Sequence, residues 1–408
     1  MFRPACIAIV SMLTVLGVAV STAPEKSSPA ALDAALRAAV EKNHIPGAIV
    51  AATDRQRVFY RNAFGMADVA NDRPMTPFTI FRIASMTKPI TSVALMQLVE
   101  QGKVGLDDPA SKYVPELGAV SVFESFDPAT HAYVVHPASR PITVRHLLTH
   151  TSGLAYNFMS PIIRDFKPRA GEQYAAGPLL FEPGQRWHYG QSTDWVGQIV
   201  ERVSGKTLEA YFLQKIFTPL RMTDTFFNIP EDKEARLVTL HRLQKDGSFK
   251  EQPNQPFRPV TRFNGGGGLS STAADYIRFV QMLLNDGELS GSRILSAESV
   301  NVMARNQIGD VGVPALKTAN PEVSNDFTFI NDGKDKFGFG FLINTEAVPG
   351  KRSAGSLTWA GVNNSYFWID RVRGIGGVIM MQVGPFADPH ALDVLDVFER
   401  GVYQLAPD

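Results

Sequence analysis

The sequence predicts an α+β sandwich: one antiparallel sheet, built from both ends of the chain and flanked by helices, with an inserted and mostly helical subdomain. Two observations predict this class. Short segments rich in β-forming residues lie near both ends of the chain, whereas helical apolar spacing dominates the middle. The 408 residues, 44% of them hydrophobic, can bury a large core, and two packed subdomains fit this length better than a string of modules.

The N-terminal part of the sheet is expected to follow a helix. Residues 30–42 have helical apolar spacing, and residues 47–52 and 58–60 form strand-like runs around the turn at Asp54-Arg55-Gln56. The C-terminal part is expected to hold three strands and a closing amphipathic helix. These elements cover residues 337–341, 365–369, 377–381 and 391–403.

The middle of the chain is expected to be mostly helix and loop. Helical spacing covers residues 90–100, 146–149, 195–203 and 276–284. Two long connections, residues 127–140 and 155–180, have the length of rim or lid loops over a site. We therefore assign the sheet subdomain to about residues 30–80 and 330–408, and the helical subdomain to the residues between them.

The first residues are predicted to be a secretory signal. Arg3 provides a positive start, residues 5–20 are almost wholly apolar, and Ser21-Thr22-Ala23 offers small residues for cleavage. The apolar run is shorter than the roughly 20 residues that a membrane span needs, which makes a retained anchor the weaker interpretation. We expect residues 1–23 to direct export to the periplasm or the medium, leaving one domain over residues 24–408 without a stable membrane span.

Composition narrows the function classes further. Cys6, the only cysteine, lies inside this signal, so the mature chain can have no disulfide, cysteine nucleophile or cysteine metal ligand. Lys plus Arg equals Asp plus Glu at 40 each, so the overall charge points to neither nucleic acid nor an anionic surface. The expected partner is a small molecule, and the composition leaves the oligomeric state open.

Ser85 and Lys88 form the only Ser-x-x-Lys spacing in the chain. About one such match is expected by chance at this length, so the context has to decide. Pro89 is tolerated in the first turn of a helix, and the apolar run over residues 90–100 follows it, which places Ser85 at a helix start. A spacing of three then puts Lys88 on the same face, one turn further along.

This arrangement suits nucleophilic catalysis. A serine hydroxyl needs a base to take its proton, and a lysine can act as that base when burial favours its neutral form. The apolar neighbours Ile83, Met86 and Ile90 are compatible with such burial, and the helix N-terminus favours a developing negative charge. The alternative is an N-cap serine beside a solvated lysine, which is the better interpretation of a random match.

Four further segments carry a resemblance that decides between these interpretations. They are residues 142–154, Trp187-His188-Tyr189-Gly190-Gln191, residues 265–276 and Trp359-Ala360-Gly361. Together with Ser85-x-x-Lys88, in this order and spacing, the chain resembles the serine β-lactamase and penicillin-binding-protein superfamily, specifically the class C β-lactamase-related serine hydrolases. The resemblance runs from about residue 31 to the C-terminus and implies a β-lactamase/transpeptidase-like fold.

The resemblance also implies site residues. Ser85 would be the acylated nucleophile, Lys88 the group that deprotonates or stabilises it, and Tyr189 the phenol that passes protons to the leaving group. The N–H groups of Ser85 and Val362 would form the oxyanion hole, and Trp359 would form a wall of the acyl pocket. Gly361 and Gln191, which occupy motif positions, are carried over as substrate-binding residues.

Two departures from the family pattern direct the choice of substrate. Gln191 stands where the family usually has Asn, and Trp359 stands where penicillin-recognising members have Lys or His. The Trp resembles the carboxylesterase-like branch, so the expected function is a carboxylesterase or acyltransferase on small neutral esters. The alternatives are a D-stereospecific amidase, peptidase or weak β-lactamase, and more distantly a catalytically silent ligand-binding module.

Other motifs are weaker. His146 and His150 have metal-ligand spacing but no intervening Glu and no evident third ligand, so we expect no metal and no cofactor. Residues 265–268, all glycine, lack the continuation of a phosphate loop and are expected to permit close backbone approach near the site. No Gly-x-Ser-x-Gly elbow occurs, which argues against an α/β-hydrolase.

Overall fold

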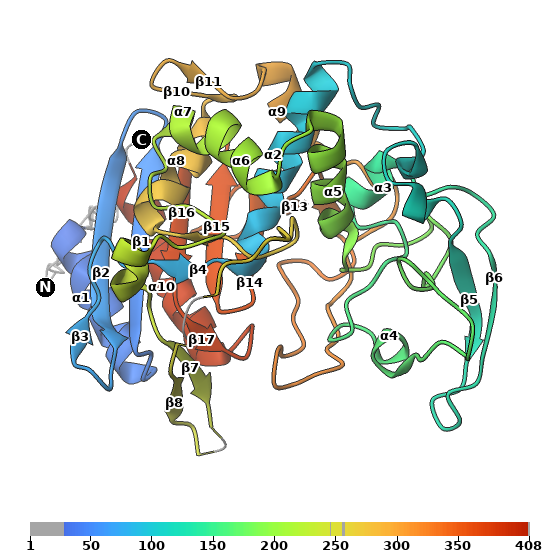
Figure 1. Cartoon of the computed structure of the whole chain (residues 1–408). Coiled ribbons are helices and arrows are strands. Elements are labelled where there is room, and N and C mark those ends of the chain that lie inside the picture. Colours follow the sequence, from blue (N-terminus) through green and yellow to red (C-terminus); the bar gives the residue numbers. More distant parts are fainter. Residues whose placement is uncertain (1–27, 245, 255–257, 407–408) are drawn as a thin grey trace, which may run out of the picture.

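The central sheet joins the two ends of the chain, as the sequence predicts (Figure 1). This computed structural model describes residues 28–244, 246–254 and 258–406. The expected export signal over residues 1–23, with Cys6, lies outside the described residues. Strand β1 pairs antiparallel with β2 on one side and with β16 on the other, with Ile49 opposite Met380 in the β1–β16 register.

The sheet has the strand order β12-β13-β14-β15-β16-β1-β2-β3. Its strands are β1 (Gly47–Asp54), β2 (Val58–Asp68), β3 (Arg73–Pro74), β12 (Lys336–Phe337), β13 (Leu342–Ile343), β14 (Leu357–Gly361), β15 (Ser365–Asp370) and β16 (Ile375–Met380). Smaller pairings lie outside it. They involve β4 (Phe81–Arg82) with β9 (Ser270–Ser271), β5 (Ser121–Phe126) with β6 (Tyr133–Pro137), β10 (Glu288–Leu289) with β11 (Ser292–Arg293), and β17 (Val383–Gly384) with β7 (Leu240–Leu243) and β8 (Phe249–Gln252).

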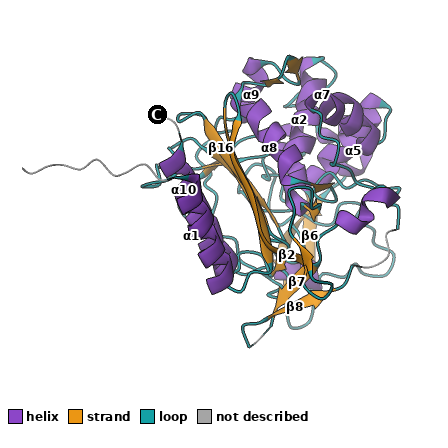
Figure 2. Cartoon of the chain, turned by 90° about the vertical axis from the view of Figure 1, so that its left-hand side faces the viewer, coloured by secondary structure: helices purple, strands orange, loops and turns teal. Residues whose placement is uncertain are grey.

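Helices cover both faces of the sheet. The α-helices of the described residues are α1 (Pro29–Lys42), α2 (Thr87–Glu100), α3 (Val144–Leu148), α4 (Pro161–Asp165), α5 (Ser192–Ser204), α6 (Leu208–Phe212), α7 (Thr218–Leu220), α8 (Ala273–Leu284), α9 (Ala297–Met303) and α10 (Pro389–Leu405). Figure 2 shows α1 and α10 on one face, with α8, α2 and α5 on the other. No helix in the described part of the chain is long and apolar enough to cross a lipid bilayer.

Strand alternation divides the core into two layers. In β15, Phe367 faces the core on the α2 and α8 side, while its neighbour Trp368 packs with Phe398 of α10 on the other side. Both faces of β15 are buried along its whole length. This explains why its four central residues, 366–369, are aromatic or aliphatic instead of alternating between apolar and polar.

The fold class is confirmed, but one predicted strand is wrong. Residues 337–341 do not form a single strand, because the chain turns back between β12 and β13, and the N–H of Gly338 donates to the carbonyl of Phe341 at 2.8 Å. Gly340 adopts φ +91°, a conformation that favours glycine. A β-carbon on Gly338 would lie 2.0 Å from the Met303 carbonyl oxygen, so this close approach requires glycine.

The long connections also contain more structure than expected. Residues 133–137 of the first connection form β6, which pairs with β5, and the second contains the short helix α4. Figure 1 shows this region beside α3 and α5, at the end of the molecule away from α1 and α10. The rest of both connections is loop, and residues 158 and 159 of the second line the candidate site described next.

Candidate active site

Ser85 lies at the junction of the sheet and the helical layer. It belongs to the short 3₁₀ turn η1 (Ala84–Met86), which leads directly into α2. Ala84 adopts φ +45°, an unfavourable conformation for a residue with a β-carbon. Such strain, typically about 1–3 kcal/mol, tends to be kept where function fixes the backbone. The Tyr276 hydroxyl of α8 also fixes this turn by donating to the Met86 carbonyl at 2.9 Å.

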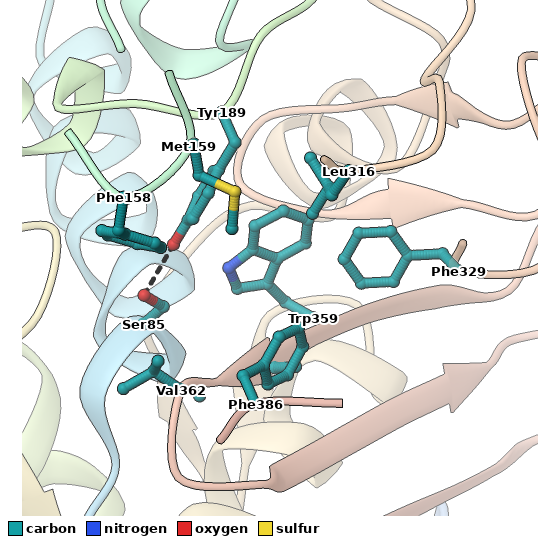
Figure 3. Close-up of a pocket in the computed structure, with 11 residues that line it drawn as sticks. Ser85, Phe158, Met159, Tyr189, Leu316, Phe329, Trp359, Val362 and Phe386 are labelled. Carbon is teal, nitrogen blue, oxygen red and sulfur yellow. Dashed lines mark hydrogen bonds between the residues drawn. The ribbon is translucent and has the colours of Figure 1, made fainter. Parts of the chain in front are cut away.

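Two predicted partners contact the Ser85 hydroxyl. Lys88 Nζ lies 3.1 Å from Ser85 Oγ, and the Tyr189 hydroxyl donates to the same oxygen at 2.6 Å. Figure 3 shows the second of these hydrogen bonds as a dashed line. Lys88 is only 1% exposed although it carries an amine. The structure therefore brings together the three residues that the resemblance placed in the catalytic group.

Lys88 has further buried partners that the sequence did not indicate. Its Nζ donates to the Gly266 carbonyl at 2.5 Å and to the Tyr156 hydroxyl at 3.2 Å. The same two residues contact Asp194, because the Gly266 N–H donates to Asp194 Oδ1 at 2.8 Å and the Tyr156 hydroxyl donates to Oδ2 at 3.2 Å. A phenol and a peptide group thus connect the buried amine to a buried carboxylate.

Burial controls the protonation of this network. Burial raises the pKa of the Asp194 carboxyl, and the charge of Lys88 together with the two hydrogen bonds opposes that rise. Burial, with the nearby carboxylate, also holds the pKa of the Tyr156 phenol well above its usual value, so Tyr156 remains a hydrogen-bond donor. Asp194 lies in the first turn of α5, where the helix dipole favours a negative charge.

The glycines before β9 allow this contact. A β-carbon on Gly266 would lie 2.3 Å from Asp194 Oδ1 and 2.7 Å from the Tyr156 hydroxyl. Thr91 of α2 holds the preceding residue by donating to the Gly265 carbonyl at 2.7 Å. The prediction that these glycines permit close backbone approach near the site is confirmed.

Gly361 brings the end of β14 against the turn that carries Ser85. A β-carbon at Gly361 would lie 2.4 Å from the Ile83 carbonyl oxygen, so the two backbones touch directly. Val362 follows immediately and lines the same pocket as Ser85. Main-chain N–H groups on either side of a nucleophile are what an oxyanion hole requires, and this arrangement can supply them from Ser85 and Val362.

The pocket beside Ser85 is lined mainly by apolar and aromatic groups (Figure 3). Its lining residues are Ser85, Phe158, Met159, Tyr189, Leu316, Phe329, Trp359, Ala360, Gly361, Val362 and Phe386. None of them is a lysine, arginine or histidine. The described lining therefore favours a neutral group, because a carboxylate would lose its hydration without gaining a cation.

The sequence profile named Beta-lactamase matches residues 32–400. The chain belongs to the β-lactamase family. Its fold is the family's β-lactamase/transpeptidase-like fold, and it is a serine hydrolase whose relatives include esterases and acyltransferases.

Three similar proteins show how far the likeness extends in sequence and in structure. The chain is 32% identical over 404 residues to monacolin J acid methylbutanoyltransferase of Aspergillus terreus (strain NIH 2624 / FGSC A1156), covering 91% of this chain and 95% of that one. It is also 32% identical over 407 residues to lovastatin esterase of Penicillium rubens, covering 91% and 98%. Among solved structures, a simvastatin synthase mutant from Aspergillus terreus superposes with a TM-score of 0.78 at 31% identity, covering 91% and 94%.

The structure also places three other residues that the sequence singled out, namely Gln191, His146 and His150. Gln191 occupies the N-cap position of α5 and is not among the described residues that line the pocket with Ser85. His146 caps α3, because its Nδ1 accepts from the Thr143 N–H at 3.2 Å. His150 packs its ring against Trp359, with centroids 6.3 Å apart and planes at 15°. Both histidines therefore have clear structural roles.

Proposed function

We propose that this member of the β-lactamase family is a carboxylesterase or acyltransferase that acts on small neutral esters through an acyl-enzyme on Ser85. One observation carries the proposal: Ser85 Oγ bonds to both Lys88 Nζ and the Tyr189 hydroxyl while opening onto an aromatic pocket without a cation among its described lining residues. The esterase and the acyltransferase among its relatives support the same chemistry.

The proposed reaction begins with attack of Ser85 Oγ on the ester carbonyl carbon, while the hydroxyl proton passes to Lys88 Nζ. The carbonyl oxygen becomes an oxyanion that accepts from the N–H groups of Ser85 and Val362. When the tetrahedral intermediate collapses, its bond to the alcohol oxygen breaks. That oxygen takes a proton through the Tyr189 hydroxyl, which leaves the acyl group on Ser85.

Deacylation repeats these steps with a new nucleophile. Water gives hydrolysis, and an alcohol gives acyl transfer. In both cases the attacking oxygen loses its proton to the same pair of groups, the bond between the acyl carbon and Ser85 Oγ breaks, and Oγ takes a proton back from that pair. The two activities therefore share one acyl-enzyme and differ in the acceptor.

Labelling and kinetics test the proposal. A fluorophosphonate should add one label to the intact protein at Ser85, and the Ser85→Ala variant should take up none while keeping its fold. Ser92→Ala is a matched control, because Ser92 is a buried serine of α2 that does not line the pocket. It should be labelled like the wild type. Catalytic efficiency on p-nitrophenyl butyrate should far exceed that on a chromogenic cephalosporin, and the reverse order would overturn the ester assignment.

We also propose that the enzyme is exported. The charged start, apolar run and small residues over residues 1–23 support this, as does the absence of cysteine from the rest of the sequence. The N-terminal residue of protein recovered outside the cytoplasm would test the cleavage site.

A further inference from the structure

The indole N–H of Trp359 is a buried donor without a hydrogen-bond acceptor among the described residues. Trp359 is only 2% exposed, and its nitrogen lies on the edge of the ring that faces Tyr189 and Ser85 (Figure 3). Buried polar groups are nearly always paired, and an unpaired one costs free energy. Trp187 and Trp368 also have a buried indole N–H without an acceptor among the described residues, but neither lines the pocket beside Ser85. Of these three donors, only the one on Trp359 belongs to a residue that lines the pocket, where a substrate can bring an acceptor.

The indole is held too firmly to turn toward another acceptor. One side of its ring stacks on Phe329, with centroids 5.1 Å apart and planes at 23°, while the imidazole of His150 lies nearly parallel to it at 6.3 Å. Phe337 packs edge-on at 5.3 Å and Tyr189 at 5.2 Å. An aromatic ring is at best a weak acceptor, so these contacts fix the orientation of the N–H without satisfying it.

The proposed reaction leaves this donor unused. A simple ester has two oxygens: its carbonyl oxygen would accept from the N–H groups of Ser85 and Val362, and its alcohol oxygen would take the proton passed by Tyr189. No third oxygen of a simple ester remains for Trp359. Among the side chains that line the pocket, only Ser85 and Tyr189 carry a hydroxyl. Those two hydroxyls bond to each other, and neither is hydrogen-bonded to the indole.

We infer that Trp359 Nε1 forms a substrate-binding subsite for a third, neutral oxygen, namely an ether, hydroxyl or carbonyl oxygen near the scissile ester. This inference rests on the proposed function and narrows its substrate class. A carboxylate is a poor fit, because a single indole N–H cannot replace the hydration of a full negative charge. The additional oxygen belongs either to the acyl group or to the alcohol, and the experiment distinguishes the two.

The test compares esters matched in shape. In the acyl arm, p-nitrophenyl methoxyacetate carries an ether oxygen where p-nitrophenyl butyrate carries a methylene. In the alcohol arm, 2-methoxyethyl butyrate is compared with butyl butyrate. Within each pair, the catalytic efficiency for the ester with the extra oxygen is divided by that for its all-carbon partner. This ratio is measured for the wild type and for Trp359→Phe. Intrinsic differences in ester reactivity are the same for both proteins and cancel from the comparison.

Removing the donor should lower the ratio in one arm by roughly 5- to 100-fold, the range expected when a buried hydrogen bond loses its partner. The arm that responds identifies the part of the substrate that carries the oxygen. Phe329→Leu is the matched control, because Phe329 stacks on the same indole and has no donor. It should change both members of each pair by a similar factor. Continued turnover of the butyrate would show that Trp359→Phe is folded.

Two results would contradict the inference in distinguishable ways. If Trp359→Phe hydrolyses these esters with wild-type ratios in both arms, the subsite is wrong while the proposed function stands. If the wild type hydrolyses none of the esters, the proposed function fails and the subsite fails with it. A ratio that falls equally in Phe329→Leu would also overturn the inference, because the effect would then come from the shape of the pocket and not from the donor.

Discussion

The two sides of Ser85 differ in how completely their polar groups are paired. On the polar side, Lys88 bonds to Tyr156 and Gly266, and both of these bond to Asp194, so each of the four groups has a partner. On the aromatic side, formed around Trp359, the buried indole N–H has no acceptor among the described residues. The difference teaches that the protein fixes the groups that move protons and leaves the indole N–H of Trp359 unpaired in the pocket that receives substrate.

The largest effect is expected on the polar side, from Lys88→Met. Methionine fills a similar volume but can neither accept the Ser85 proton nor donate to Gly266. Catalytic efficiency on p-nitrophenyl butyrate should fall by about 10⁴-fold or more, as is usual when one member of a nucleophile and base pair is lost. Circular dichroism and fluorophosphonate labelling would separate loss of chemistry from loss of fold. A folded variant that keeps a tenth of the wild-type activity would contradict the assignment of Lys88 as the base.

A smaller effect is expected from Asp194→Asn, which removes the buried negative charge but keeps a similar shape. Asp194 acts through Tyr156 and Gly266, so we treat it as a positioning residue, and kcat should fall by roughly 10-fold. KM should change little, because neither Asp194 nor its partners Tyr156 and Gly266 line the pocket beside Ser85.

Tyr156→Phe is the matched variant for this prediction. It breaks the hydrogen bonds to Lys88 and Asp194 but leaves the carboxylate in place. It should also lower kcat and leave KM nearly unchanged. Wild-type kcat in both folded variants would show that the network has only a structural role.

The sequence predicted the partners of Ser85 better than it predicted the rest of the polar side. Ser85 and Lys88 share one helix start, and Tyr189 belongs to a recognisable motif, so local spacing and resemblance were enough to place them together. Tyr156 and Asp194 lie on a loop and at a helix start whose approach to Lys88 depends on tertiary packing. An acidic residue five positions after the motif tyrosine, directly before the helix predicted over residues 195–203, was the only available sign of Asp194.

Backbone geometry explains two other features that the sequence did not predict. The alternation of Phe and Gly over residues 337–341 fits a strand, but the contact of Gly338 with the Met303 carbonyl turns the chain instead. Nothing in an alanine side chain indicates the positive φ of Ala84, because the surrounding turn imposes it. By contrast, the sheet was predictable because its strands are apolar and its two halves lie at opposite ends of the chain.

The smallest effect concerns His146 in the capping box of α3, where acid should destabilise the fold. Burial, with the charges of Arg140 and Arg145, lowers the pKa of His146 to about 4. The unfolded chain has a histidine pKa of about 6.5, so it binds a proton that the folded protein excludes between these values. This contribution to stability is therefore complete above about pH 6.5 and is lost as the pH falls toward 4.

His146→Gln isolates this contribution to the free energy of unfolding, because glutamine can still accept from the Thr143 N–H in the capping box but does not titrate. Urea unfolding at about pH 7 and about pH 5 measures the change in the free energy of unfolding. The wild type should lose on the order of 2 kcal/mol more than the variant over this interval, from the linkage of the single imidazole. His150 is also buried, and burial holds its pKa well below the usual value, but it is present in both proteins and its effect cancels. Equal losses in the two proteins would show that His146 does not titrate with unfolding, and acid sensitivity would then have to come from another group.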